Sequence, residues 1–228
     1  MENTSTPSLA PAAQPSVLTR VRVTFSKSGS LIYTGALDLQ KIWERVLRRA
    51  SLKVAYTQGF NPGPRINLAS ALPLGVTGEQ ELADFWFSEE PDLNTFCEQV
   101  NRSSPPGLRA ILAEIVPLSV PALQTRVDSA VYRTGLFLIE EMPPINDSVK
   151  EILLSETLPR ERRGKPYDLR PLILDLKLLS GENASEAYLE MHLKAREGAT
   201  GRADEVLAEL GLEPASVSLS RVLIHLLP

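Results

Sequence analysis

The chain has 228 residues, of which 43% are hydrophobic and 23% charged, so its composition is that of a globular protein rather than a fibrous or mostly disordered one. Its 24 basic and 28 acidic residues give a net charge of −4. This excludes a surface that is basic all over and binds polyanions with any face, but it allows a local basic face. One cysteine, Cys97, excludes an intramolecular disulfide and an all-cysteine metal site, and two histidines offer little for a histidine-rich centre, so we expect no metal and no cofactor.

Residues 1–19 are rich in proline, alanine, serine and threonine, and they lack the basic start and apolar centre of a signal peptide. We predict a disordered tail, because the segment has too few apolar side chains to join a core. No apolar run approaches the roughly 20 residues that span a bilayer. We therefore expect a cytoplasmic protein with no membrane partner.

Residues 20–117 read as one α+β unit. Val21, Val23 and Phe25 alternate with polar residues, which predicts a strand over 20–26. An apolar stripe at spacings of three and four predicts a helix over 36–51. The further elements expected are strands over 53–57 and 81–87, a helix over 91–101 and a strand over 108–116, in the order β-α-β-β-α-β.

Residues 122–228 repeat this order after a predicted hinge at 117–121. The expected elements are a strand over 127–139, a helix over 146–157, a basic loop over 159–170, a hairpin of 172–179 and 187–195, a helix over 202–210 and a strand over 216–227. We therefore predict an α+β fold of two tandem ferredoxin-like (βαββαβ) domains with antiparallel sheets, comprising residues 20–117 and 122–228.

Charge is polarised along the chain, because residues 20–65 hold nine basic and two acidic residues, a net charge of +7. On the predicted helix over 36–51, Lys41, Arg45 and Arg48 form one stripe opposite the apolar face, with Arg49 beside it. Such a stripe can follow the phosphates of a nucleic acid. The alternative interpretation is a solvated helix face.

Two loops are further candidate sites. In the loop 59–65, two glycines and two prolines favour a sharp turn, Phe60 and Asn61 can contact a base, and Arg65 can bind phosphate through its guanidinium fork. The alternative is a rigid connection with Phe60 in the core. The loop 160–170 has a net charge of +3. It is either a mobile segment that closes on an anionic ligand or an ordinary exposed loop. Its candidate ligand-binding residues are Arg162, Arg163, Lys165 and Arg170.

Common catalytic motifs are absent from the sequence: it has no phosphate-binding loop, no His-Glu-x-x-His, no Cys-x-x-Cys and no Gly-x-Ser-x-Gly. It also lacks the Cys-x-x-x-Cys-x-x-Cys motif of radical S-adenosylmethionine (radical SAM) enzymes, so the chain is not such an enzyme by itself. We therefore name no catalytic residue beyond the weak candidate His192, which the strand pattern places off the apolar face, where it can act as a general acid or base.

Several segments resemble the family of radical SAM-linked proteins, namely residues 25–29, 37–39, 44–50, 56–62 and 72–76, and more loosely 164–171 and 202–207. That family is a domain of unknown function, found alone or fused behind a radical SAM domain that itself resembles cobalamin-binding enzymes. The resemblance implies an accessory function beside a radical SAM enzyme. Members often carry histidine where this chain has Gly63, a departure that favours a binding role for the loop over a chemical one.

From these observations we expect a protein that binds RNA, either tRNA or rRNA, and presents it to the radical SAM partner. In this hypothesis the arginines of the stripe and Arg65 neutralise phosphates, while the cations of the loop 160–170 approach from the other domain. The first alternative is a module that docks the radical SAM enzyme through the basic face, without RNA. The second is a metal-independent endoribonuclease that uses His192.

Overall fold

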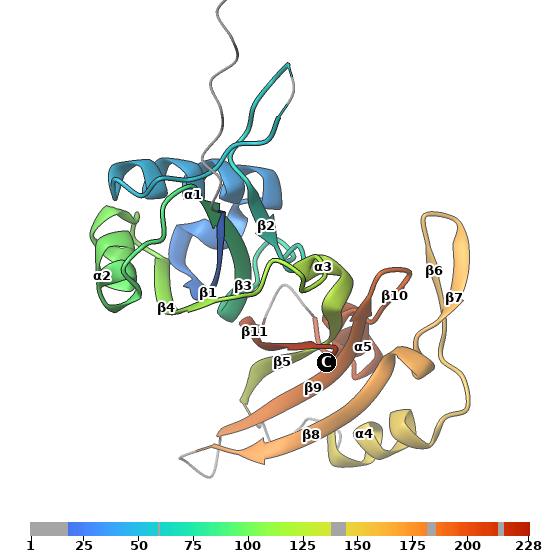
Figure 1. Cartoon of the computed structure of the whole chain (residues 1–228). Helices are drawn as coiled ribbons and strands as arrows, with labels where there is room; N and C mark the ends of the chain where they lie inside the picture. The colour runs from blue at the N-terminus through green and yellow to red at the C-terminus, as the bar shows by residue number, and fades with distance from the viewer. Residues whose placement is uncertain (1–17, 59, 138–144, 182–185, 214–216) are drawn as a thin grey trace, which may run out of the picture.

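The computed structural model describes residues 18–58, 60–137, 145–181, 186–213 and 217–228. Within these ranges the chain is an α+β fold built on one mixed sheet of nine strands, with a separate two-stranded sheet beside it (Figure 1). No helix among these residues has the length and apolar character needed to cross a membrane.

The N-terminal half follows the predicted order of elements, and its four strands pair antiparallel in the order β4-β1-β3-β2. Helices α1 and α2 lie on one face of these strands (Figure 1), and Trp43, which is fully buried, packs there between Phe25 and Phe85. The elements are β1 (Thr19–Lys27), the 3₁₀ helix η1 (Gly29–Tyr33), α1 (Ala36–Arg49), β2 (Ile66–Leu68), β3 (Thr77–Phe87), α2 (Leu93–Ser103) and β4 (Leu108–Ile115).

In the C-terminal half, four long strands are arranged in the order β8-β9-β5-β11, again with antiparallel neighbours. Their core includes Leu189, Met191, Val206 and Leu207, all fully buried. The elements are α3 (Leu123–Arg126), β5 (Val127–Phe137), α4 (Ile145–Leu154), β6 (Pro159–Arg162), β7 (Lys165–Asp168), the 3₁₀ helix η2 (Arg170–Leu172), β8 (Ile173–Ser180), β9 (Glu186–Arg196), β10 (Ala199–Thr200), α5 (Ala203–Glu209) and β11 (Leu219–Leu226).

The two halves share one sheet, because β11 pairs with β3 in parallel, Ser220 opposite Thr77 and Arg221 opposite Gly78. The expectation of purely antiparallel sheets was wrong at this junction. A buried ion pair lies beside it: Arg221 donates to both carboxylate oxygens of Glu81, at 2.7 and 2.5 Å. Gly78 makes room for this pair, since a Cβ there would lie 2.5 Å from Cγ of Glu81.

The segment 117–121, predicted to be a hinge, is fastened to the first strand. The Arg20 guanidinium donates to the carbonyl oxygens of Val120 and Pro121, at 2.6 and 3.0 Å. Since α3 follows directly and Gln124 accepts a hydrogen bond from Asn67 at 2.7 Å, residues 117–126 lie against the outer face of β1, β2 and β3.

Two predicted elements differ from the structure. Residues 53–57 are not a strand of the sheet, and the second strand is β2 instead. The predicted basic loop 159–170 contains the hairpin β6–β7, whose turn places Arg163 at φ 51° and Gly164 at φ 73°, the two positive values that a tight two-residue turn requires. Four predicted segments fall partly outside the described residues: most of the tail 1–19, the first residue of the loop 59–65, the last two of the strand 127–139 and the first of the strand 216–227.

Candidate nucleic-acid interface

Residues 53–58 and 60–65 form the two sides of an arm that extends beyond α1 from the N-terminal half (Figure 1). Its two sides are joined by hydrogen bonds from Thr57 N to Gly63 O at 2.7 Å and from Arg65 N to Ala55 O at 2.8 Å. At its end the side chain of Phe60 is fully exposed. The alternative in which Phe60 belongs to the core is therefore wrong.

A groove runs along each side of the arm. One, of about 380 Å³, is lined by Arg48 and Lys53, and the other, of about 550 Å³, is lined by Arg65. Val54 and Tyr56, the latter 47% exposed, line both grooves, so this side of the arm forms the ridge between them. Sequence reasoning missed Tyr56; the available signal was an aromatic residue directly before the glycine- and proline-rich loop.

The basic stripe on α1 faces solvent as predicted, because the opposite side of the helix buries Trp43 and its apolar neighbours. Lys41 pairs with Asp38 at 3.3 Å, an exposed contact that neutralises part of its charge. Arg45, Arg48 and Arg49 are exposed and, among the described residues, form no ion pair. Lys53 is likewise exposed without an ion pair in the described residues, and of these four cations Arg48 and Lys53 line a groove with the arm residue Tyr56.

Arg65 lies at the base of the arm, with its guanidinium carbon 4.9 Å from the ring centre of Trp86. A second guanidinium, that of Arg20, lies 5.2 Å from the same ring. Contacts of this length are favourable cation–π interactions and hold the Arg65 head in place. Arg65 is half-buried, so the predicted phosphate-binding fork is stacked on an aromatic ring at the edge of a groove.

Three of the nine cations in the segment 20–65 are not available at the surface. Arg20 and Arg22 both bind the carboxylate of Asp84, which is fully buried, with Arg22 Nε 2.8 Å from its Oδ1. Lys27 is also buried and donates to the carbonyl oxygen of Thr34 at 2.8 Å. The local charge of +7 therefore overstates what the surface presents.

The second basic cluster lies on the C-terminal half, at the turn of the β6–β7 hairpin, and Figure 1 shows this hairpin well away from the arm. Arg162, Arg163 and Lys165 are exposed there. Arg170 is not free for a ligand, because its Nη1 and Nη2 donate to the carbonyl oxygens of Ile173 and Leu153, at 3.0 and 2.8 Å. The structure therefore does not bring the two predicted basic clusters together.

A larger cleft of about 940 Å³ lies at the junction of the two halves, where β11 meets β3. Its walls are contributed by residues 70–76 and the end of η1 on one side, and by residues 200–204 and 217–221 on the other. Two segments that carry the family resemblance, 72–76 and the start of 202–207, line it. Sequence reasoning missed this cleft, because its walls come from segments far apart in the chain.

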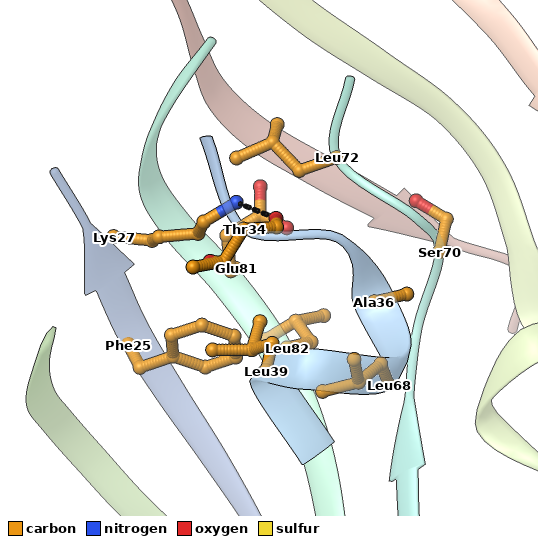
Figure 2. A pocket seen from close by; sticks show the side chains of 10 residues that line it. All are labelled: Phe25, Lys27, Thr34, Ala36, Leu39, Leu68, Ser70, Leu72, Glu81 and Leu82. Atoms are coloured by element: carbon orange, nitrogen blue, oxygen red, sulfur yellow. Dashed lines mark hydrogen bonds between the residues drawn. The ribbon is translucent and has the colours of Figure 1, made fainter. Parts of the chain in front are cut away.

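Directly behind the cleft is a small cavity of about 10 Å³, room for a single water molecule (Figure 2). Lys27 and Glu81 line it, and Figure 2 shows the Lys27 amine directed toward Glu81 and Thr34. Desolvation by burial lowers the pKa of Lys27, with Glu81 opposing the shift and Arg221 adding to it. The site therefore holds two buried basic side chains and one buried carboxylate.

His192 lies on the C-terminal sheet, far along the chain from any arm residue. Its Nε2 is 2.8 Å from Oγ of Ser129, and its ring centre is 5.1 Å from that of His225. Desolvation lowers the pKa of His192, and the charge of His225 adds to the shift. His192 lines neither the grooves nor the cleft. Within the described part of the chain, no three His, Cys, Asp or Glu side chains gather into a metal site.

Comparison with curated proteins finds no match. Among solved structures, the chain is similar to the acetolactate synthase small subunit of Thermotoga maritima, with 12% identity, 92% of this chain and 97% of that chain covered, and a TM-score of 0.25. A TM-score this low does not establish a shared fold. The family model described as "Uncharacterized protein conserved in bacteria (DUF2344)" matches residues 20–203, and the chain belongs to that family.

Proposed function

We propose that the chain binds RNA through the arm and the stripe on α1. One observation carries the proposal: two exposed aromatic side chains, Tyr56 and Phe60, stand on a projecting arm, and Arg48, from the exposed stripe on α1, lines a groove together with Tyr56. Aromatic rings next to cations are the recurring means of holding single-stranded nucleic acid, since bases stack on rings while phosphates meet guanidiniums.

The grooves beside the arm support a single-stranded rather than a duplex ligand. Their volumes of about 380 and 550 Å³ suit individual unstacked nucleotides. Tyr56, on the ridge between them, can stack against a base from either side. Arg48 and Arg65, one on each groove, are placed to contact the flanking phosphates.

We further propose that the RNA is a tRNA or rRNA presented to a radical SAM enzyme, which rests on the resemblance to radical SAM-linked proteins. We also propose that each half is a ferredoxin-like domain. The strand orders β4-β1-β3-β2 and β11-β5-β9-β8 support this, since both follow one plan of four antiparallel strands.

The test is binding of a fluorescently labelled single-stranded RNA of about 12 nucleotides, measured by anisotropy across a salt series. We expect Arg45→Glu with Arg48→Glu to weaken binding more than tenfold and to reduce the slope of log K against log salt by about 1.4, because two phosphate contacts are lost. A matched control, Lys150→Glu with Lys177→Glu, makes the same change in charge at exposed sites of the C-terminal half and leaves binding unchanged.

The aromatic contribution is tested separately. Tyr56→Ala and Phe60→Ala each remove about 1–3 kcal/mol of stacking without changing the salt slope. If wild-type protein binds neither this RNA nor bulk tRNA at low salt, the RNA proposal is wrong. Capture of a radical SAM enzyme that survives nuclease treatment and is lost in the Arg45/Arg48 variant would then favour the docking alternative.

A further inference from the structure

The cleft at the junction of the two halves is preformed and open. Its floor is fixed by Arg221, whose Nη1 donates to Oγ of Ser70 at 2.9 Å and to the carbonyl oxygen of Ala71 at 3.3 Å. Its rim is fixed by a hydrogen bond from Gly75 N to the carbonyl oxygen of Ile32 at 3.0 Å. A volume of about 940 Å³ falls in the range of small-molecule sites, which favour such junctions.

The walls of the cleft are largely apolar and are left uncovered on the N-terminal side. Tyr33 is 72% exposed and Leu74 is 65% exposed, and both border the cleft. Small residues opposite them keep the space open. At Gly201 a Cβ would lie 2.9 Å from the carbonyl oxygen of Leu172, so a glycine is needed for that wall to pack this closely.

Arginines provide most of the charge that lines the cleft. Of the charged residues that line it, three are arginines and one, Asp204, is a carboxylate. Arg221 is fully committed to protein groups, and Arg202 binds Asp204 through Nε, at 3.0 Å, and through Nη2, with Oε1 of Glu205 3.4 Å from the same Nε. Arg162, on the β6–β7 hairpin, is exposed and has no hydrogen bond or ion pair within the described residues.

The buried cations strengthen this field. Lys27 and Arg221 lie behind the cleft wall with Glu81 as the carboxylate between them, two basic side chains to one acid in a buried region with room for a single water molecule. Charges in such a region are screened less than at the surface, and they attract an anion into the adjoining cleft.

We infer that the cleft binds an organic anion, a phosphate or carboxylate group attached to a planar or apolar body. The anionic group contacts Arg162 and Nη1 of Arg202, the guanidinium nitrogen that has no partner among the described residues, at the C-terminal wall. The body lies on Tyr33 and Leu74 at the opposite wall. This site is separate from the arm, and the inference does not depend on RNA binding.

The experiment uses the full chain and four probes: phenyl phosphate, benzoate, inorganic phosphate and benzyl alcohol. Binding is followed by ¹H–¹⁵N chemical-shift changes, which also locate the ligand. We expect saturable shifts with phenyl phosphate or benzoate, centred on residues 71–76 and 200–204. Benzyl alcohol lacks the anionic group and inorganic phosphate lacks the aromatic body, so we expect each of them to bind at least tenfold more weakly. The comparison of phenyl phosphate with benzoate distinguishes a phosphate from a carboxylate ligand.

Arg162→Ala and Tyr33→Ala are the test variants, because both residues are exposed and neither is needed for the core. Each should weaken binding of the preferred anion about tenfold, as expected for loss of one charge-assisted or aromatic contact. Arg109→Ala, an exposed arginine on β4 that lines none of the grooves or the cleft, is the matched control and should bind as the wild type does. The inference is overturned if neither organic anion binds saturably, if shifts map elsewhere, or if Arg162→Ala and Tyr33→Ala bind unchanged.

Discussion

The buried ion pair of Arg221 and Glu81 gives the sharpest test of how the two halves are held together. Both side chains are almost inaccessible, at 2% and 4% exposed. Burial alone would lower the pKa of Arg221, but the Glu81 carboxylate raises it above its ordinary value, so the arginine stays charged. Arg221→Met removes the cation and leaves Glu81 buried with Lys27 as its remaining cationic neighbour.

Removing one partner of a buried pair costs about 3–5 kcal/mol. Because Lys27 still compensates part of the Glu81 charge, we expect the lower end, about 3 kcal/mol. For a chain of this size each kcal/mol shifts the melting temperature by about 2–4 °C, so the expected decrease is about 6–12 °C. The decrease should persist in 1 M salt, since buried pairs are screened much less than exposed ones.

The measurement is thermal unfolding followed by circular dichroism at low and high salt. Arg133→Met is the matched control, because it removes an arginine from a more exposed pair, with Glu190 at 2.7 Å, worth about 1 kcal/mol or less. Arg221→Met combined with Glu81→Leu should recover most of the loss, since no buried charge is left unpaired. If Arg221→Met melts no lower than Arg133→Met, the pair does not hold the junction and the reasoning is refuted.

Three further predictions concern other parts of the molecule. Gly107→Ala should lower the melting temperature at least twice as much as Gly164→Ala, because both glycines have positive φ but only at Gly107 would a Cβ meet backbone, 2.3 Å from the carbonyl oxygen of Ser28. Equal decreases for the two variants would contradict this steric argument. Asn101→Ala should increase self-association, measured by light scattering, because the Asn101 amide bonds both backbone groups of Ala110 on the edge strand β4, where Ile111 and Leu112 are half exposed. Unchanged scattering would show that other features protect this strand. The free energy of unfolding should fall as the pH drops below about 6.5, because the lowered pKa of His192 leaves the folded state less protonated than the unfolded state. His192→Asn should flatten this pH dependence, and an unchanged slope would assign the pH dependence to other groups.

Local sequence patterns predicted most elements of this fold. The stripe on α1 places Trp43 inward and Arg45 outward by helical periodicity alone, and both positions are confirmed. The alternation in β1 separated its apolar face from its polar face in the same way. The prediction of a strand over 53–57 failed because these residues divide their pairing between two partners. Val54 forms a single bridge to Phe87 at the end of β3, while Tyr56 pairs with Pro64 within the arm.

The candidate sites depended much more on tertiary structure. Alternation predicts that Arg20 and Arg22 share the polar face of a strand, but it does not say whether that face meets solvent. Both arginines are buried because Asp84, more than 60 residues along the chain, lies opposite them and residues 117–126 cover the face.

Most elements, their amphipathic faces and the exposed arginines of α1 could be predicted from local patterns, because these follow from contacts a few residues apart. Three features depend on how the chain folds in space: the sheet shared by the two halves, the joint burial of Lys27 and Arg221, and the cleft between residues 70–76 and 200–204. Those features arise from contacts between segments more than 100 residues apart, such as Arg221 with Glu81, and no local pattern specifies which distant side chain supplies the partner for a buried charge.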